Sequence, residues 1–139
     1  MKIYNCLFCN KECLFDGRKT NKYCAGTTCQ VSFQNLERVE RWLATGIIGN
    51  KTSQTPQWLR KYILSKQDGK CAECGIAEWN NKPIVFELEH KDGNSENNAE
   101  LNLSLLCPNC HSQTPIYKGA NRGNCRHSRR ERYKAGKSF

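Results

Sequence analysis

The sequence predicts a small α+β fold that depends on its cysteines more than on a large apolar core. Three observations lead to this fold class. Only 37% of the 139 residues are hydrophobic, and ten residues are cysteines. The spacing of apolar residues also changes, from the three- and four-residue period of helices before residue 70 to the alternation of a strand after residue 83. A chain this polar needs cross-links to hold its modules together.

The N-terminus indicates what kind of cross-links these are. The opening sequence MKIYNCLFCNKEC lacks the apolar run of a secretory signal, and no stretch approaches the roughly 18 apolar residues of a membrane span. The sequence therefore predicts a cytoplasmic protein without a membrane partner. Thiols stay reduced in that compartment, where paired cysteines bind zinc more often than they form disulfides.

Residues 1–35 are predicted to form an N-terminal zinc-finger module. Five cysteines and little periodicity are typical of short turns around a metal rather than of a packed sheet. A Cys-x2-Cys pair and a wider Cys-x4-Cys pair supply the expected zinc ligands, Cys6, Cys9, Cys24 and Cys29. Cys13 competes for a place in this site, and Cys125 is the other spare cysteine.

Two helices are predicted next, and most of their length lies in a connector of residues 36–66. The first covers Val31–Ala44 and is stopped by Gly46, since its apolar residues recur at three- and four-residue spacing, at Phe33, Leu36, Val39 and Leu43. The second starts at Thr55–Pro56, with a capping hydroxyl and a proline at the first helical position, and ends at Asp68–Gly69.

Residues 67–120 are predicted to contain two strands and a helix in the order ββα. An alternating run that ends at His90 predicts a half-buried strand. Its two faces are Ile84, Phe86 and Leu88, and Val85, Glu87 and Glu89. The polar segment 91–98 is rich in Gly and Asn and must loop out. A leucine-rich return over residues 101–106 predicts the second strand, and Pro108 suits the first turn of a helix.

Two Cys-x2-Cys pairs bracket the predicted strands, with 32 residues between them. Together they complete a tetrahedral zinc shell of four thiolates, Cys71, Cys74, Cys107 and Cys110. Such a closed shell leaves no open position on the metal, so this zinc is expected to hold structure, and any catalytic group must lie elsewhere. The alternative is four reduced thiols that happen to pair by spacing.

Glu89 and His90 end the first predicted strand, and His111 directly follows the last zinc ligand. Zinc anchors the start of the helix, which fixes where His111 points relative to the strands. A single histidine is more often an ordinary surface or core residue, but two of the three histidines in the chain lie around this hairpin, which favours a site. For Glu89 the alternative is a solvated carboxylate at a strand end.

Four short runs around the hairpin form a recognisable pattern. They are LEHKDGN (88–94), NN (97–98), LNL (101–103) and LLCPNCHSQT (105–114). In this order and spacing, over roughly residues 67–120, they resemble the HNH nucleases of the His-Me finger group, particularly the small zinc-bearing type of phages and bacteria. The resemblance implies a ββα-metal fold and DNA cleavage that leaves 5′-phosphate and 3′-hydroxyl ends. For a phage protein, the cytoplasm is that of the bacterial host.

The resemblance also implies roles for four residues. His90 matches the histidine that activates water, and Asn102 matches the asparagine that braces the loop and so orients that histidine. His111 matches a ligand of the catalytic divalent metal. Glu89 stands where relatives commonly have aspartate or histidine as the other ligand, and its carboxylate suits Mg2+ or Mn2+.

Positive charge points to a polyanionic partner. The net charge is +9, and residues 118–139 hold eight Lys or Arg against one acid, so +7 of the total lies there. Within this region, residues 121–139 are predicted to form a basic tail. This tail is expected to bind double-stranded DNA, and a disordered tail can do so as well. The predicted DNA-binding residues are Arg122, Arg126, Arg129, Arg130, Arg132, Lys134 and Lys137.

Three functions are compatible with these features. A metal-dependent endonuclease uses Glu89, His90, Asn102 and His111 together. A non-catalytic zinc-dependent DNA-binding protein needs none of these four residues, and neither does an adaptor within a phage packaging machine. The sequence therefore favours the enzyme.

Overall fold

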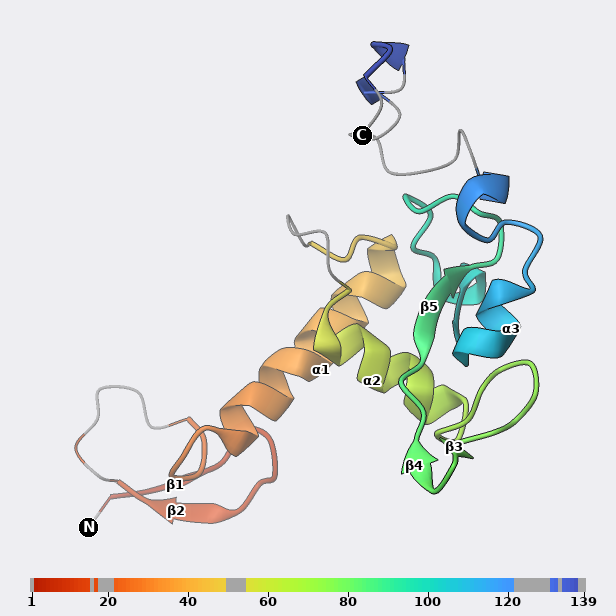
Figure 1. The fold of residues 1–139 in the computed structure, drawn as a ribbon. Helices are drawn as coiled ribbons and strands as arrows, with labels where there is room; N and C mark the ends of the chain where they lie inside the picture. Colours follow the sequence, from red (N-terminus) through yellow and green to blue (C-terminus); the bar gives the residue numbers. More distant parts are fainter. Residues whose placement is uncertain are drawn as a thin grey trace.

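The structure, a computed structural model, describes residues 2–15, 17, 22–49, 55–121, 131–132 and 134–137. Within these ranges it is a small mixed arrangement of helices and short strands (Figure 1). The elements are β1 (Ile3–Asn5), β2 (Glu12–Leu14), α1 (Thr28–Thr45), α2 (Gln57–Lys66), β3 (Glu78–Trp79), β4 (Lys82–Pro83), β5 (Glu87–His90), the 3-10 turn η1 (Glu100–Asn102), β6 (Leu103–Leu106), α3 (Pro108–Ser112) and the 3-10 turn η2 (Lys118–Asn121). The described strands pair antiparallel as β1 with β2, β3 with β4 and β5 with β6. No helix in the described ranges has the length and apolar character needed to cross a bilayer.

The N-terminal module contains a small hairpin that the sequence did not predict. β1 and β2 pair so that Ile3 lies opposite Leu14. Tyr4 in β1 donates its hydroxyl to the Tyr23 carbonyl at 2.6 Å, which ties the hairpin to the segment before α1. Each strand has three residues, too few to produce a recognisable alternation in the sequence. Figure 1 shows this hairpin at the start of α1, far from the other strands.

The first predicted helix is confirmed, with an earlier start. α1 begins at Thr28, so its first turn includes the predicted ligand Cys29. It stops at Gly46, as predicted. The φ of Gly46 is 68°, in the left-handed region that glycine adopts readily, and its N–H donates to the Trp42 carbonyl at 2.7 Å. α1 also runs unbroken through residue 35, and the division into modules at that residue stays a prediction.

The second helix also forms, but its predicted start at Thr55–Pro56 is wrong by one position. Pro56 is extended, with ψ 142°, and α2 begins at Gln57 without a side-chain capping bond. The Pro56 carbonyl instead accepts N–H groups from the first turn at 3.2 Å. Proline is still tolerated here because a residue before the first turn needs no N–H donor. The helix ends at Lys66, just before the predicted Asp-Gly stop.

β5 and β6 form the hairpin that the sequence predicts, with two corrections. β5 begins at Glu87 rather than at residue 84, and His90 pairs with Leu103 at its other end. Leu101 does not belong to the second strand, because it lies in the turn η1 and is 87% exposed. The chain uses this helical turn to return from the loop, so β6 starts only at Leu103.

Side chains from α2 and its C-terminal end bond the backbone of the hairpin. Gln67 pairs with Leu105 as a neighbouring strand would, donating Nε2–H to its carbonyl at 2.9 Å and accepting its N–H at 2.8 Å. Arg60 donates to the carbonyl of Phe86, the residue directly before β5. These bonds satisfy polar groups on the outer edges of both strands.

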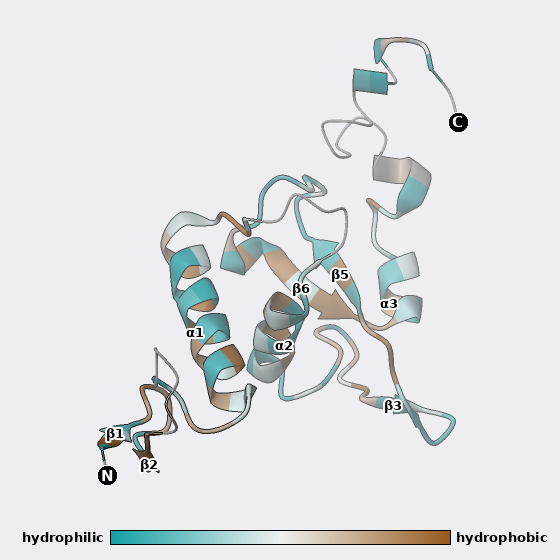
Figure 2. Cartoon of the chain, turned by 90° about the vertical axis from the view of Figure 1, so that its left-hand side faces the viewer, coloured by the Kyte–Doolittle hydropathy of each residue, from teal (hydrophilic) through white to brown (hydrophobic). Residues whose placement is uncertain are grey.

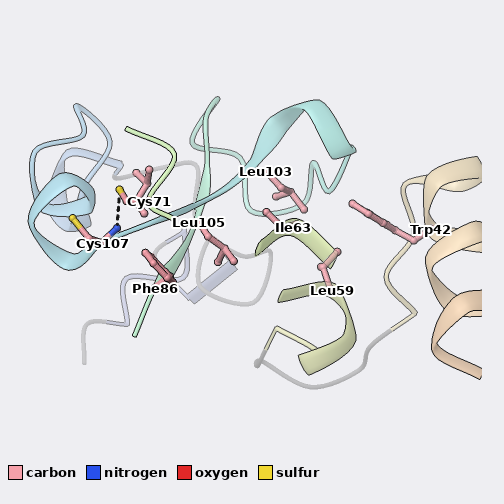
Figure 3. Packing of buried hydrophobic residues seen from close by; sticks show 9 residues of the cluster. Trp42, Leu59, Ile63, Cys71, Phe86, Leu103, Leu105 and Cys107 are labelled. Carbon is pink, nitrogen blue, oxygen red and sulfur yellow. Dashed lines mark hydrogen bonds between the residues drawn. The ribbon is translucent and has the colours of Figure 1, made fainter. Parts of the chain in front are cut away.

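The apolar core lies between α2 and the β5–β6 hairpin (Figure 3). Its buried members are Trp42, Leu59, Ile63, Cys71, Phe86, Leu103, Leu105, Leu106 and Cys107. Figure 2 shows β6 as a hydrophobic strand behind α2, and all four of its residues are buried. The core therefore runs continuously from Trp42 on α1 to the cysteines beside α3, and it places α1, α2 and α3 around one hairpin.

Leu105→Ala is expected to lower the free energy of unfolding by about 2–5 kcal/mol, because its side chain fills the core and is 1% exposed. Leu101→Ala is the matched control and should cost less than about 0.5 kcal/mol, because Leu101 projects into solvent. Urea unfolding in the presence of zinc, followed by circular dichroism, measures both changes. Equal destabilisation by the two variants contradicts the placement of Leu101 outside the strand pair.

Candidate active site

The second predicted set of four cysteines comes together beside α3. The Sγ atoms of Cys71, Cys74, Cys107 and Cys110 all lie within 4.8 Å of one another. The Cys107 N–H donates to Cys71 Sγ at 3.2 Å (Figure 3), and the Cys110 N–H donates to Cys107 Sγ at 3.4 Å. Four sulfur donors at this spacing are the donor set of a structural zinc site, so this cluster can hold a zinc ion.

The Cys71 and Cys110 thiols of this cluster do not both ionise at neutral pH without a cation. Burial raises the pKa of the Cys71 thiol, but N–H groups of Cys74, Cys107 and Glu73 outweigh burial and lower that pKa to about 6. The neighbouring Cys74 thiol, followed by that of Cys107, raises the pKa of Cys110 to about 12. A divalent cation removes this conflict because it binds all four thiolates.

A second cluster forms in the N-terminal module. The Sγ atoms of the four predicted ligands, Cys6, Cys9, Cys24 and Cys29, also lie within 4.8 Å of one another. Cys13 Sγ is 3.7 Å from Cys24 Sγ, but Cys13 is not one of these four. Both predicted sets can therefore hold a metal ion. Cys125 lies outside the described residues.

Glu89 is buried at the end of β5 rather than solvated. Only 6% of its surface is exposed, and Oε2 lies 2.9 Å from Nε2 of His111 in α3. Burial raises the pKa of the Glu89 carboxyl, and the charges of His111 and His90 oppose that shift. A buried carboxylate costs free energy unless a positive group compensates it, so Glu89 is not the solvated strand-end carboxylate of the alternative interpretation.

Glu87 is a site residue that the sequence analysis missed. Its Oε2 contacts Nδ1 of His111, so the imidazole lies between two carboxylates from one strand. Glu87 and Glu89 are two residues apart on β5 and therefore project from the same face. This period of two was visible in the sequence, but only the packing of α3 shows that a histidine lies opposite both carboxylates.

Asn98, to which the sequence analysis also gave no role, holds the His90 ring. Its Nε2 lies 3.0 Å from Asn98 Oδ1. The Asn98 amide nitrogen donates to the Glu96 carbonyl at 3.3 Å, which fixes the amide with its oxygen toward His90. Because an amide oxygen only accepts, Nε2 of His90 carries the proton, and Nδ1 carries the lone pair in the neutral ring.

Asn102 braces the loop between the strands from within. Its residue surface is 9% exposed, and its Oδ1 accepts the Asp92 N–H at 3.0 Å. Its Nδ2 donates to Asp92 Oδ1 at 2.8 Å and to the Asn97 carbonyl at 2.7 Å. A hydrogen bond from the Asn97 side chain is the main cause that lowers the pKa of Asp92, aided by the Asn94 N–H and by Asn102. The loop that follows His90 is therefore closed by side-chain hydrogen bonds at both of its ends.

The predicted DNA-binding tail is described only in part. Arg132, Lys134 and Lys137 lie in the described ranges, and Lys134 Nζ is 3.0 Å from Glu131 Oε1. The other four predicted residues lie outside the described residues, namely Arg122, Arg126, Arg129 and Arg130. Contact between this tail and DNA stays a prediction.

The purified protein is expected to contain two zinc ions per chain, because two four-thiol clusters are present in the described structure. Cys71→Ser should lower this content to about one ion, because one thiolate of a closed shell is lost. Cys13→Ser is the matched control and should leave it unchanged, because Cys13 is outside both clusters. Elemental analysis measures all three contents. A loss of zinc in the Cys13 variant would show that this cysteine is a ligand after all.

Comparison with known proteins relates part of this chain to a phage endonuclease. Over 82 residues the chain is 46% identical to the H-N-H endonuclease F-TflIV of Escherichia phage T5. The match covers 58% of this chain but only 36% of the relative's length. No family model matches the chain, and no solved structure matches it significantly. The curated relative confirms the resemblance to HNH endonucleases that the sequence motifs indicate.

Proposed function

We propose that the chain is a metal-dependent HNH endonuclease that hydrolyses phosphodiester bonds in double-stranded DNA. The observation that carries the proposal is the buried Glu89 carboxylate, 2.9 Å from His111 Nε2 and next in sequence to His90. The chain order β5, β6, α3 supports a ββα-metal unit of the His-Me finger type. The similarity to a phage protein named as an H-N-H endonuclease supports the same reaction.

Glu89 and His111 are the residues that hold the catalytic divalent metal in this proposal. A carboxylate oxygen beside an imidazole nitrogen suits Mg2+ or Mn2+. The soft thiolates of the two four-cysteine clusters do not suit these metals. Glu87 contacts Nδ1 of His111 and so orients the imidazole ring. The other ring nitrogen, Nε2, then points toward the Glu89 carboxylate. When bound, the cation supplies positive charge that stabilises the phosphorane and the leaving oxygen.

His90 takes the proton from the attacking water. Asn98 keeps the proton on Nε2, so Nδ1 is the atom that accepts the new one. The water oxygen forms a bond to phosphorus while the bond from phosphorus to the 3′ oxygen breaks. That oxygen leaves as a hydroxyl after taking a proton from a solvent water, and the proton on His90 Nδ1 returns to solvent. A positioned general base is worth about 10²–10⁴-fold in rate, so the position of His90 is decisive.

The basic tail supplies sequence-independent affinity for DNA in this proposal. Lysine and arginine that neutralise phosphates release condensed counterions, and this needs no fixed shape of the tail. Of the +9 net charge, +7 lies in residues 118–139, beyond the hairpin and α3. The tail therefore adds binding without taking part in the proton transfer.

The two other candidate functions leave the site geometry unexplained. A DNA-binding protein needs phosphate contacts but gains nothing from a buried carboxylate against an imidazole, which costs stability. An adaptor in a packaging machine needs a docking surface rather than a histidine held in one tautomer. Glu89, His111 and the Asn98-bound His90 therefore favour the enzyme over both alternatives.

His90→Ala is expected to lower cleavage of supercoiled plasmid by about 10²-fold or more while DNA binding and zinc content stay unchanged, because only proton removal is lost. Glu89→Gln should instead raise the Mg2+ or Mn2+ concentration needed for half-maximal cleavage, because a ligand loses its charge. Glu78→Gln, on β3 and exposed, is the matched control and should change neither quantity.

Cleavage rates at several metal concentrations distinguish these outcomes, with zinc content measured for each variant. A His90→Ala variant that cleaves at the wild-type rate with its zinc intact contradicts the proposed mechanism. The DNA-binding alternative is then the better interpretation.

Deletion of residues 122–139 is expected to weaken DNA binding and to flatten its salt dependence, since each lost phosphate contact removes roughly 0.9 from the log–log slope. Cleavage at low salt should survive, because His90 and its neighbours are untouched. In a full-length control variant, the basic residues of the tail are changed to Gln, which removes the charge but keeps the length of the chain. Its salt dependence should match that of the deletion. An unchanged slope in both variants shows that the tail does not touch DNA.

A further inference from the structure

We propose that Trp42, on α1, is a positioning residue for the general base His90. This inference rests on the proposed function and deepens it, because it assigns a role to a residue 48 positions before His90 in the sequence. The indole N–H of Trp42 holds the backbone of Asn98, and Asn98 in turn holds the His90 ring.

The first link is a hydrogen bond between distant parts of the chain. Trp42 Nε1 donates to the Asn98 carbonyl at 2.7 Å, across 56 positions of sequence. Trp42 is 1% exposed and among the largest fully buried side chains described. A buried indole N–H needs an acceptor, and here the acceptor is the carbonyl of one loop residue rather than a group of its own helix.

The second link is within Asn98 itself. Its carbonyl accepts from Trp42 and its side-chain Oδ1 is bonded to His90 Nε2 at 3.0 Å, so one residue joins both. Any shift of the Asn98 backbone therefore moves the group that sets the tautomer and direction of the His90 ring. Misplacing a reacting group by about 1 Å can cost on the order of 10²-fold in rate.

Trp42 can act as a fixed point because its own ring is held on two sides. Its ring centroid is 6.2 Å from that of Trp58 and 5.5 Å from that of Tyr62, both in edge-to-face geometry. Tyr62 also bonds the far end of the loop, because its hydroxyl donates to Glu100 Oε1 at 2.7 Å. α1 and α2 thus hold the loop at separate points, and of these two bonds it is the one from Trp42 that reaches the residue that contacts His90.

Trp42→Phe tests this role because it keeps an aromatic ring in the core and removes the N–H. Trp79→Phe, on β3, is the matched control: it makes the same change in a tryptophan that is 69% exposed and that is not one of the two rings described above as packed against Trp42. Replacing Trp42 with benzothienylalanine, which has sulfur in place of the N–H, keeps the full shape of the side chain. This third variant separates the hydrogen bond from the packing.

All variants are compared as full-length, zinc-loaded protein on supercoiled plasmid at saturating Mg2+ or Mn2+. Both Trp42 variants should lower kcat by about 10-fold or more with KM and zinc content unchanged, because binding groups are untouched and only the base is misplaced. Amide hydrogen exchange over residues 91–99 should be faster in both. Trp79→Phe should leave kcat and this exchange unchanged, because its side chain is exposed.

Two results overturn the inference in different ways. A wild-type protein that does not cleave DNA with either metal removes the proposed function and this role with it. A wild-type protein that cleaves, while the benzothienylalanine variant keeps its kcat and its loop exchange, leaves the proposed function standing and shows that Trp42 only packs.

Discussion

The four-cysteine cluster beside α3 is the constraint on which the rest of the site depends. α3 has five residues, far fewer than the roughly 12–15 that a helix needs to be even marginally stable alone. Cys107 caps its start and Cys110 lies inside it, so both join the helix to Cys71 and Cys74. Because His111 is the next residue, a metal bound by these thiolates fixes a side chain that takes no part in the cluster.

With α3 fixed, the period of β5 decides which groups meet His111. Glu87 and Glu89 project from one face of the strand and contact the two nitrogens of the imidazole. Two carboxylates lie around one imidazole ring, and one of them is buried. Together they create a negative electrostatic potential that favours a cation. Apolar packing of β6 against α2 keeps the strand in register, so the core and the charged site are two faces of one hairpin.

The loop after His90 is held by side-chain hydrogen bonds from three different elements of the fold. Asn102 closes it from within, Trp42 bonds it from α1 and Tyr62 bonds its far end from α2. A polar loop would otherwise lose little free energy by moving, and His90 at its edge would move with it. The helices before the hairpin therefore have a part in the site as well as in the core.

The sequence by itself determined the elements with strong local signals: the cysteine sets, α1 with its glycine stop, and the hairpin around Glu89 and His90. It failed at the boundaries of elements, where local signals are weak, as at Leu101 in η1 and at Pro56, which is extended before the start of α2. Only the tertiary structure showed that Glu87 contacts His111, Asn98 contacts His90 and Trp42 bonds Asn98, because these partners lie up to 56 positions apart in the sequence. Spacing along a chain fixes direction within one element, whereas contacts between elements depend on how their buried faces pack.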